Sequence, residues 1–198
     1  ITEISKRIYD EDLRISELVR ILFHELSQKG KSPIYNLLPD TLSKLSLERS
    51  KGTMSKDHFR GIIGFLLGFI TKEKHTESLV EKLCHRFKTA EEEFQYRDLA
   101  YCLSQIHFSE KPVRKLLDMY PVYKEKLRDS QVFRYFSEIE KKSRKFAKAE
   151  TKNLLDELAA RLNRKEDDDG DVKQSSPMSG KKEQRERPRR NILKASEE

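Results

Sequence analysis

The chain has 198 residues, 38% of them charged and 35% hydrophobic, and a formal net charge of +7 at pH 7. A chain of this length can bury a real core, but its longest apolar stretch, residues 59–70, is shorter than the roughly 20 residues of a membrane span. The 2 cysteines argue against a disulfide framework and are typical of a reducing compartment, and the positive charge favours nucleic acid or acidic proteins as partners.

Helical spacing of apolar residues starts close to the N-terminus, and no segment shows the alternation of a strand. Residues 1–9 are expected to be the end of a helix cut by the start of a fragment, because the chain begins without methionine or a signal peptide. Asp10 is expected to cap the next helix, which Gly30 ends. That helix carries one apolar stripe, made of Ile15, Leu18, Val19, Leu22, Phe23 and Leu26.

The middle of the chain contains the helix predicted to be the most buried. After a helix that begins near Pro33 and a polar loop over residues 46–54, Ser55 caps a segment that is apolar nearly all round. Three glycines share one side of this segment: Gly61, Gly64 and Gly68. Because each costs about 1 kcal/mol relative to alanine in a helix, we expect a neighbouring helix to approach closely there in compensation.

Five further helices are predicted before the composition changes. The first lies over about 74–88, and the second begins at a capping box, Thr89–Glu92. The third runs from Ser109 to Pro121, and the last two lie over about 130–146 and 149–164. From Lys165 onward the apolar periodicity stops and charges come in blocks. This segment has too little apolar surface to offset the entropy lost when a chain becomes ordered. Acidic and basic residues are equal in number there, so the whole net charge belongs to residues 1–164.

Antiparallel helix pairs with about 40 residues per unit are typical of HEAT and armadillo arrays. The sequence therefore predicts an all-α protein, with a HEAT/armadillo-type α-solenoid of antiparallel helix pairs over residues 1–164 and a disordered, charged C-terminal tail over residues 165–198. No clear repeat is found in the sequence itself, and a compact helical bundle is the competing architecture.

Residues that could carry catalysis or bind metal are not arranged for either. The five histidines are His24, His58, His75, His85 and His107. None is spaced as a helical metal pair with another histidine or a cysteine. Cys84 lies on an apolar stripe, where its thiol is expected to be an inert core group, and no glycine-rich phosphate loop occurs. We therefore predict no catalytic residue, no metal or cofactor site, no small-molecule substrate and no enzymatic activity.

The strongest binding signal is a basic cluster near a helix end. Its members are Lys141, Lys142, Arg144, Lys145 and Lys148. Three of them, Lys141, Lys145 and Lys148, are expected to share one helix face and to neutralise DNA phosphates without reading bases. A solvated lysine face is the alternative interpretation, and positive charge is also favourable near a helix C-terminus.

The tail holds a second basic cluster and one phosphorylation candidate. The cluster is typical of a nuclear-localisation or polyanion-binding run, although acidic residues interrupt it, and consists of Lys181, Lys182, Arg185, Arg187, Arg189 and Arg190. Ser176 precedes a proline, which is a minimal proline-directed phosphorylation pattern.

Two segments carry a family resemblance. They are HELSQKGKSPIYNLLPDTLSKLS, at His24–Ser46, and ITKEKHTESLVEKLCHRFKTAEEEFQYRDLAYCLSQIHFSEKPVRKLLD, at Ile70–Asp118. The most specific pieces are IYNLLPD, TESLVEKLCHRF and RDLAYCLSQ. Over about residues 24–160 the chain resembles the C-terminal part of the condensin complex subunit 1 family, the HEAT-repeat, non-SMC subunits of condensin I.

The resemblance implies a function without marking an active site. Members of this family are non-catalytic α-solenoid subunits that dock on the kleisin, contact the SMC ATPase heads and DNA, and help to organise mitotic chromosomes. It therefore implies kleisin and SMC partners, sequence-independent binding to chromatin, no membrane partner, and a location in the nucleus and on chromosomes, cytoplasmic in part of the cell cycle. It also implies mitotic phosphorylation of disordered ends. The alternative is a HEAT-type adaptor of a related assembly, such as the condensin II counterpart or a transport or scaffold factor, without DNA contact.

Overall fold

The computed structural model describes residues 1–30 and 33–163, and within these ranges the chain forms helices and no strand. Two short 3-10 segments, η1 (Lys6–Tyr9) and η2 (Lys124–Arg128), accompany the α-helices. The α-helices are α1 (Thr2–Ser5), α2 (Leu13–Gln28), α3 (Pro33–Ser50), α4 (Lys56–Leu67), α5 (Glu73–Arg86), α6 (Glu93–Ser104), α7 (Glu110–Asp118), α8 (Tyr120–Tyr123), α9 (Ser130–Arg144) and α10 (Ala149–Asn163).

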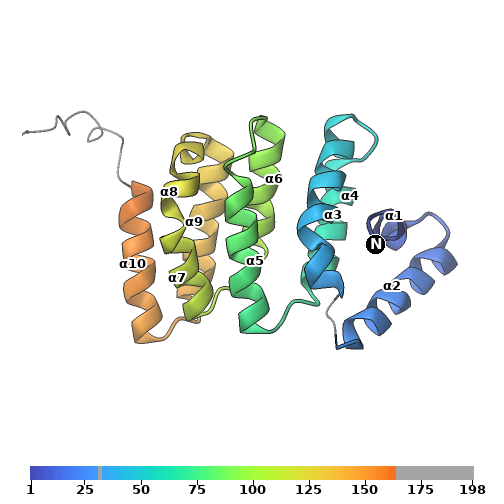
Figure 1. The fold of residues 1–198 in the computed structure, drawn as a ribbon, viewed down its shortest axis with the longest axis horizontal. Helices are drawn as coiled ribbons and strands as arrows, with labels where there is room; N and C mark the ends of the chain where they lie inside the picture. Colours follow the sequence, from blue (N-terminus) through green and yellow to red (C-terminus); the bar gives the residue numbers. More distant parts are fainter. Residues whose placement is uncertain (31–32, 164–198) are drawn as a thin grey trace, which may run out of the picture. The chain divides into compact units, whose positions relative to one another are not determined.

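The longer helices from α3 onward lie side by side in two layers, as Figure 1 shows. α3 packs on α4, and α5 packs on α6. Within the layers α5 contacts α7 and α6 contacts α9, and α10 then packs against both α7 and α9. The prediction of an all-α solenoid of helix pairs is thus confirmed for the part of the chain that the structure describes.

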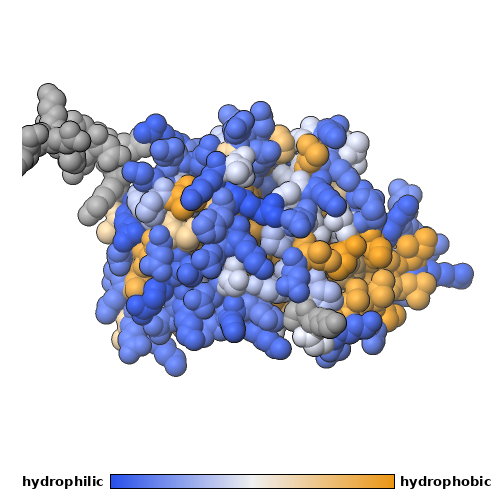
Figure 2. Space-filling model, viewed as in Figure 1, coloured by the Kyte–Doolittle hydropathy of each residue, from blue (hydrophilic) through white to orange (hydrophobic). Residues whose placement is uncertain are grey.

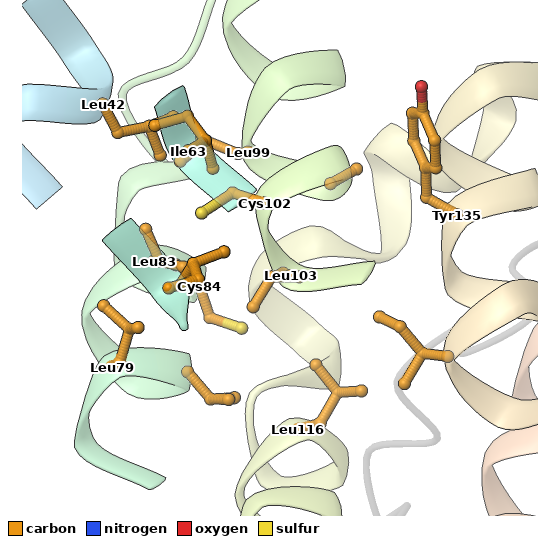
Figure 3. Packing of buried hydrophobic residues seen from close by; sticks show 14 of the residues in the cluster. Leu42, Ile63, Leu79, Leu83, Cys84, Leu99, Cys102, Leu103, Leu116 and Tyr135 are labelled. Atoms are coloured by element: carbon orange, nitrogen blue, oxygen red, sulfur yellow. The ribbon is translucent and has the colours of Figure 1, made fainter. Parts of the chain in front are cut away.

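Apolar side chains fill the space between the layers (Figure 3). Leu79, Leu83 and Cys84 of α5 lie with Leu103 of α6 and Leu116 of α7, and all five are completely buried. Burying one such leucine side chain stabilises a protein by about 1.5–3 kcal/mol. Each helix reaches this burial only through its neighbours, because its apolar stripe has no other surface to cover it.

A buried carboxylate ties α3 to α6. Asp98 of α6 accepts a hydrogen bond from Ser46 Oγ at 2.6 Å and one from Arg49 Nε at 3.0 Å, both from α3. Burial raises the pKa of Asp98, and the hydrogen bonds from Ser46 and Arg49 oppose this effect without cancelling it. The pairing is needed because an unpaired buried carboxylate would be strongly destabilising.

A second carboxylate ties α6 to α9. Asp129 is the N-cap of α9, where Oδ1 accepts the backbone N–H groups of Gln131 at 2.9 Å and Val132 at 3.0 Å. Its Oδ2 lies 2.6 Å from Nη2 of Arg97 on α6. Burial acts to raise the pKa of Asp129, but the hydrogen bonds from Arg97 and from the backbone outweigh it and hold the pKa below its usual value. One side chain therefore begins a helix and fixes its position on the neighbour.

The outer faces of the first and last long helices differ. α10 buries Leu155, Leu158 and Leu162 and exposes polar residues on its opposite face. α2 instead exposes apolar side chains, since Leu18 is 66% exposed and Ile21 is 58% exposed. Figure 2 shows apolar surface gathered in the region of α2, at the right of the view. α10 thus has the polar outer face of a capping helix, whereas α2 presents an apolar surface that no described residue covers.

Several expectations about helix ends are wrong. Asp12, and not Asp10, caps α2, since its side chain accepts the N–H of Arg14, while Asp10, two residues earlier, accepts the N–H of Asp12. The expected loop over 46–54 is helical as far as Ser50, because Ser46 and the residues around it pack on α6. The capping box of α6 is built by Glu92 and Gln95 and not from Thr89, because the helix starts later.

The close approach expected at the glycines holds only at Gly61. A Cβ there would lie 2.7 Å from Cε2 of Tyr9, so the ring of η1 packs directly on the α4 backbone. No atom lies within 4 Å of such a Cβ at Gly64, and at Gly68 it would meet only carbonyl oxygens of Phe65 and Gly64. The Ser55 cap of α4 is confirmed, since its Oγ accepts the N–H of His58 at 3.1 Å.

Replacing Asp129 should separate its two roles. Asp129→Asn keeps a capping side chain but loses the charge facing Arg97, and should lower the free energy of unfolding by about 1 kcal/mol at pH 7, whereas Asp129→Ala also loses the cap and should cost about 2 kcal/mol. Because the folded-state pKa is lowered, the difference between wild type and Asp129→Asn is fully present above about pH 4 and lost as the pH falls through the folded pKa. Urea titrations at several pH values measure this.

The exposed pair Arg134 and Glu138 on the same helix supplies the control. Glu138→Gln should change stability by less than about 0.5 kcal/mol. A wild-type-like stability for Asp129→Ala would contradict the role assigned to Asp129.

The apolar face of α2 should make the chain self-associate at high concentration. Leu18→Glu with Ile21→Glu should reduce this association and leave the unfolding midpoint nearly unchanged, because both side chains are exposed already. Sedimentation velocity over a range of concentrations measures the first effect, and chemical denaturation the second. Asn153→Glu with Ala160→Glu on the polar face of α10 makes the same charge change and should not alter association. If both variants associate equally, the apolar face of α2 is not the cause of self-association.

Candidate nucleic-acid interface

The five predicted basic residues lie on the last turn of α9 and in the connection to α10, residues 141–148, here called the lysine turn. α9 ends at Arg144, so Lys145 and Lys148 belong to the connection. The expected helical face of Lys141, Lys145 and Lys148 is therefore wrong as a continuous stripe. The chain leaves the helix one turn earlier than the charge pattern indicates.

Two of the five cations are held by the protein itself. Arg144 lies 2.5 Å from Glu140 and 2.8 Å from Asp156 of α10, and so joins α9 to α10. Lys142 Nζ donates to the carbonyl oxygen of Ser104, at the end of α6, at 3.3 Å. Both side chains have structural roles, which reduces the positive charge that the lysine turn offers to a ligand.

Lys141, Lys145 and Lys148 are exposed, and among the described residues no carboxylate lies within ion-pair distance of any of them. Phe146 stands between two of these lysines with 83% of its surface exposed. It lines, with Lys142 and Lys148, a hollow of about 530 Å³ beside the ends of α6 and α9. Three solvated point charges in one short segment can neutralise phosphates but do not form a fixed recognition pattern.

The second predicted cluster and the phosphorylation candidate cannot be placed. Ser176 lies outside the described residues, as does the tail cluster of Lys181, Lys182, Arg185, Arg187, Arg189 and Arg190.

The two thiols are both core groups. Cys84 and Cys102 are buried and free, and burial raises the pKa of Cys102 to about 12 and that of Cys84 further still. Among the described residues no group of three or more histidine, cysteine or acidic side chains is placed to hold a metal ion. No helix in the described ranges is both long enough and apolar enough to cross a membrane.

Comparison with known proteins identifies a family for most of the chain. Residues 1–104 match the family described as non-SMC mitotic condensation complex subunit 1. The chain is 47% identical to condensin complex subunit 1 of Xenopus laevis over 164 residues, which are 83% of this chain and 12% of that protein. It is 43% identical to the human condensin complex subunit 1 over 162 residues, 82% of this chain and 11% of that protein.

The chain belongs to the condensin complex subunit 1 family. A plant relative, the condensin-1 complex subunit CAP-D2 of Arabidopsis thaliana, is 40% identical over 83% of this chain and 11% of its own length. The chain thus spans about an eighth of the length of these relatives. No solved structure matches it. The resemblance seen in the sequence segments is confirmed, but the family match ends at Ser104, before the lysine turn.

Proposed function

We propose that this chain is a non-catalytic scaffold within a condensin complex, where it takes part in mitotic chromosome condensation by binding kleisin and SMC subunits and DNA backbone. The single observation that supports the complex most directly is membership of the condensin complex subunit 1 family. A stack of helix pairs offers a long surface for other macromolecules, which suits such a role. Nuclear and chromosomal localisation, with a cytoplasmic phase in the cell cycle, belongs to the same proposal.

The proposed DNA contact is the lysine turn, through Lys141, Lys145 and Lys148. Their exposure and their lack of carboxylate partners among the described residues support phosphate neutralisation without base readout. The competing function is a HEAT-type adaptor without DNA contact. It is favoured by the pairing of Arg144 with Glu140 and Asp156, which removes one cation from the cluster.

Association with the complex is tested by co-purification. The tagged chain, added to a mitotic extract, should retain SMC and kleisin subunits identified by mass spectrometry. Leu18→Glu with Ile21→Glu serves as a comparison, because it removes the apolar face of α2 without touching the lysine turn. Absence of condensin subunits from every eluate would contradict the scaffold role of this chain.

DNA binding should depend on salt and on two exposed lysines. Lys141→Glu with Lys145→Glu should weaken binding to duplexes of any sequence alike and reduce the slope of log K against log salt by about 2, since two phosphate contacts are lost. Fluorescence anisotropy from about 50 to 200 mM salt measures both quantities.

Two other exposed lysines provide the matched control. Lys51→Glu with Lys88→Glu makes the same change in net charge on other parts of the chain. Both variants should be compared with wild type on one duplex. Equal loss of affinity in both would mean that net charge, and not the lysine turn, attracts DNA, and no binding at low salt would favour the adaptor.

A further inference from the structure

A second charged hollow lies apart from the lysine turn and shares no lining residue with it. Four helices, α3, α4, α6 and α9, surround a cleft of about 430 Å³. Four cations line it: Arg49, Lys56, Arg60 and Arg97. Three arginines in one cleft are unusual unless carboxylates hold them, so the partners of each decide what the cleft can bind.

Two of the arginines are neutralised within the fold. Arg49 Nη2 lies 2.9 Å from Asp98 Oδ2. Arg97 is paired twice, at 2.6 Å with Asp129 and at 2.8 Å with Glu93. These guanidinium groups hold α3, α6 and α9 together, and neither is available to a ligand without breaking a structural pair.

Arg60 of α4 is different. Its Nη2 donates to the hydroxyl of Tyr135 at 2.6 Å, and its guanidinium carbon lies 4.8 Å from the ring centre of Tyr101. Within the residues that the structure describes, no carboxylate is within ion-pair distance of it. A guanidinium has five N–H donors, so most of its donors remain unused. Two tyrosines thus hold a half-buried cation in place, and its positive charge acts on Asp98 only at longer range, where it opposes the rise in the pKa of that carboxyl.

We propose that this cleft binds an acidic side chain of an extended segment of a partner protein, with Arg60 as the group that receives the carboxylate. A planar guanidinium matches a carboxylate through two parallel hydrogen bonds, and partial burial strengthens such a pair relative to one in water. Tyr101, which is half-buried, supplies aromatic surface against which a neighbouring residue of the segment packs, whereas the buried Tyr135 only positions Arg60.

The walls of the cleft favour a protein segment over nucleic acid. Glu92, Glu93 and Asp98 also line it, so three carboxylates nearly balance its four cations and leave little net charge to attract a polyanion. A segment with one acidic residue needs only Arg60, and a basic neighbour of that residue can face Glu92. The inference rests on the proposed scaffold role, since it assigns the chemistry of one protein contact.

The test selects ligands without assuming a partner. A library of random dodecapeptides is selected on the whole wild-type chain, after depletion on Arg60→Gln. Selected peptides should share an aspartate or glutamate at one position. Replacing that residue by its amide should weaken binding by about tenfold or more, and Arg60→Gln should weaken binding of the parent peptide equally. The two changes made together should cost little more than either alone, because they remove the same contact.

Controls distinguish loss of the Arg60 contact from loss of the folded structure and from a general loss of positive charge. Arg114→Gln removes an exposed arginine of α7, outside the cleft, and should leave peptide affinity unchanged. Thermal unfolding establishes that each variant is folded. If Arg60→Gln does not fold, Arg60→Lys decides in its place: it retains the charge without the planar fork and should bind the acidic peptide more weakly than wild type.

Three results overturn the proposal. One is selection of no peptide, or of peptides without a shared acidic residue. Another is equal affinity of an acidic peptide for wild type and for the folded Arg60 variant. The third is a loss of duplex DNA binding in Arg60→Gln as large as that in Lys141→Glu with Lys145→Glu, which would assign the cleft to nucleic acid. Co-purification of condensin subunits is a separate measurement, so the scaffold role and the cleft can fail independently.

Discussion

The structure depends on apolar helix faces that are buried only by the next helix in the stack. Leu79, Leu83 and Leu116 have no exposed surface because α5, α6 and α7 cover one another, and no single pair could do this alone. The same constraint explains why the two ends differ. α10 has a single apolar side and is the last helix of the described stack, whereas α2 has Leu18 and Ile21 on a side that faces no other described helix.

Carboxylates at the helix contacts then fix how neighbouring helices are aligned. Apolar packing alone tolerates small shifts between helices, but a buried carboxylate is costly unless one particular partner meets it. Asp98 and Asp129 impose this condition at the α3–α6 and α6–α9 contacts, through Arg49 and Arg97. The cleft around Arg60 lies between these two fixed contacts. Its shape is therefore set by ion pairs that do not themselves take part in binding.

Much of the fold follows from local signals, and what does not follow depends on distant residues. The Ser55 cap and the helices over 130–146 and 149–164 were predictable because capping and periodicity are properties of neighbouring residues. The expected loop over 46–54 was wrong because Ser46 is held by Asp98, 52 positions away. The lysine turn was visible as a cluster, but its loss of Arg144 to Asp156 was not, since that pair joins two helices. Arg60 was visible in the sequence only as the charge that interrupts the apolar segment 59–70, and its role was not, because its environment comes from α6 and α9.

The two candidate surfaces illustrate why net charge alone says little about partners. The +7 is a difference between totals and does not say which cations are paired: Arg49, Arg97 and Arg144 meet carboxylates inside the fold, whereas Lys141 and Lys148 meet none among the described residues. The cations that have no carboxylate partner differ between the two candidate surfaces. Exposed, hydrated ammonium groups of the lysine turn suit a flexible array of phosphates, to which they contribute charge without direction. A guanidinium fixed between two tyrosines, with carboxylates close by, suits one planar anion in one orientation. The same chain can therefore offer DNA a diffuse contact and a protein segment a specific one, and the difference lies in how each cation is held.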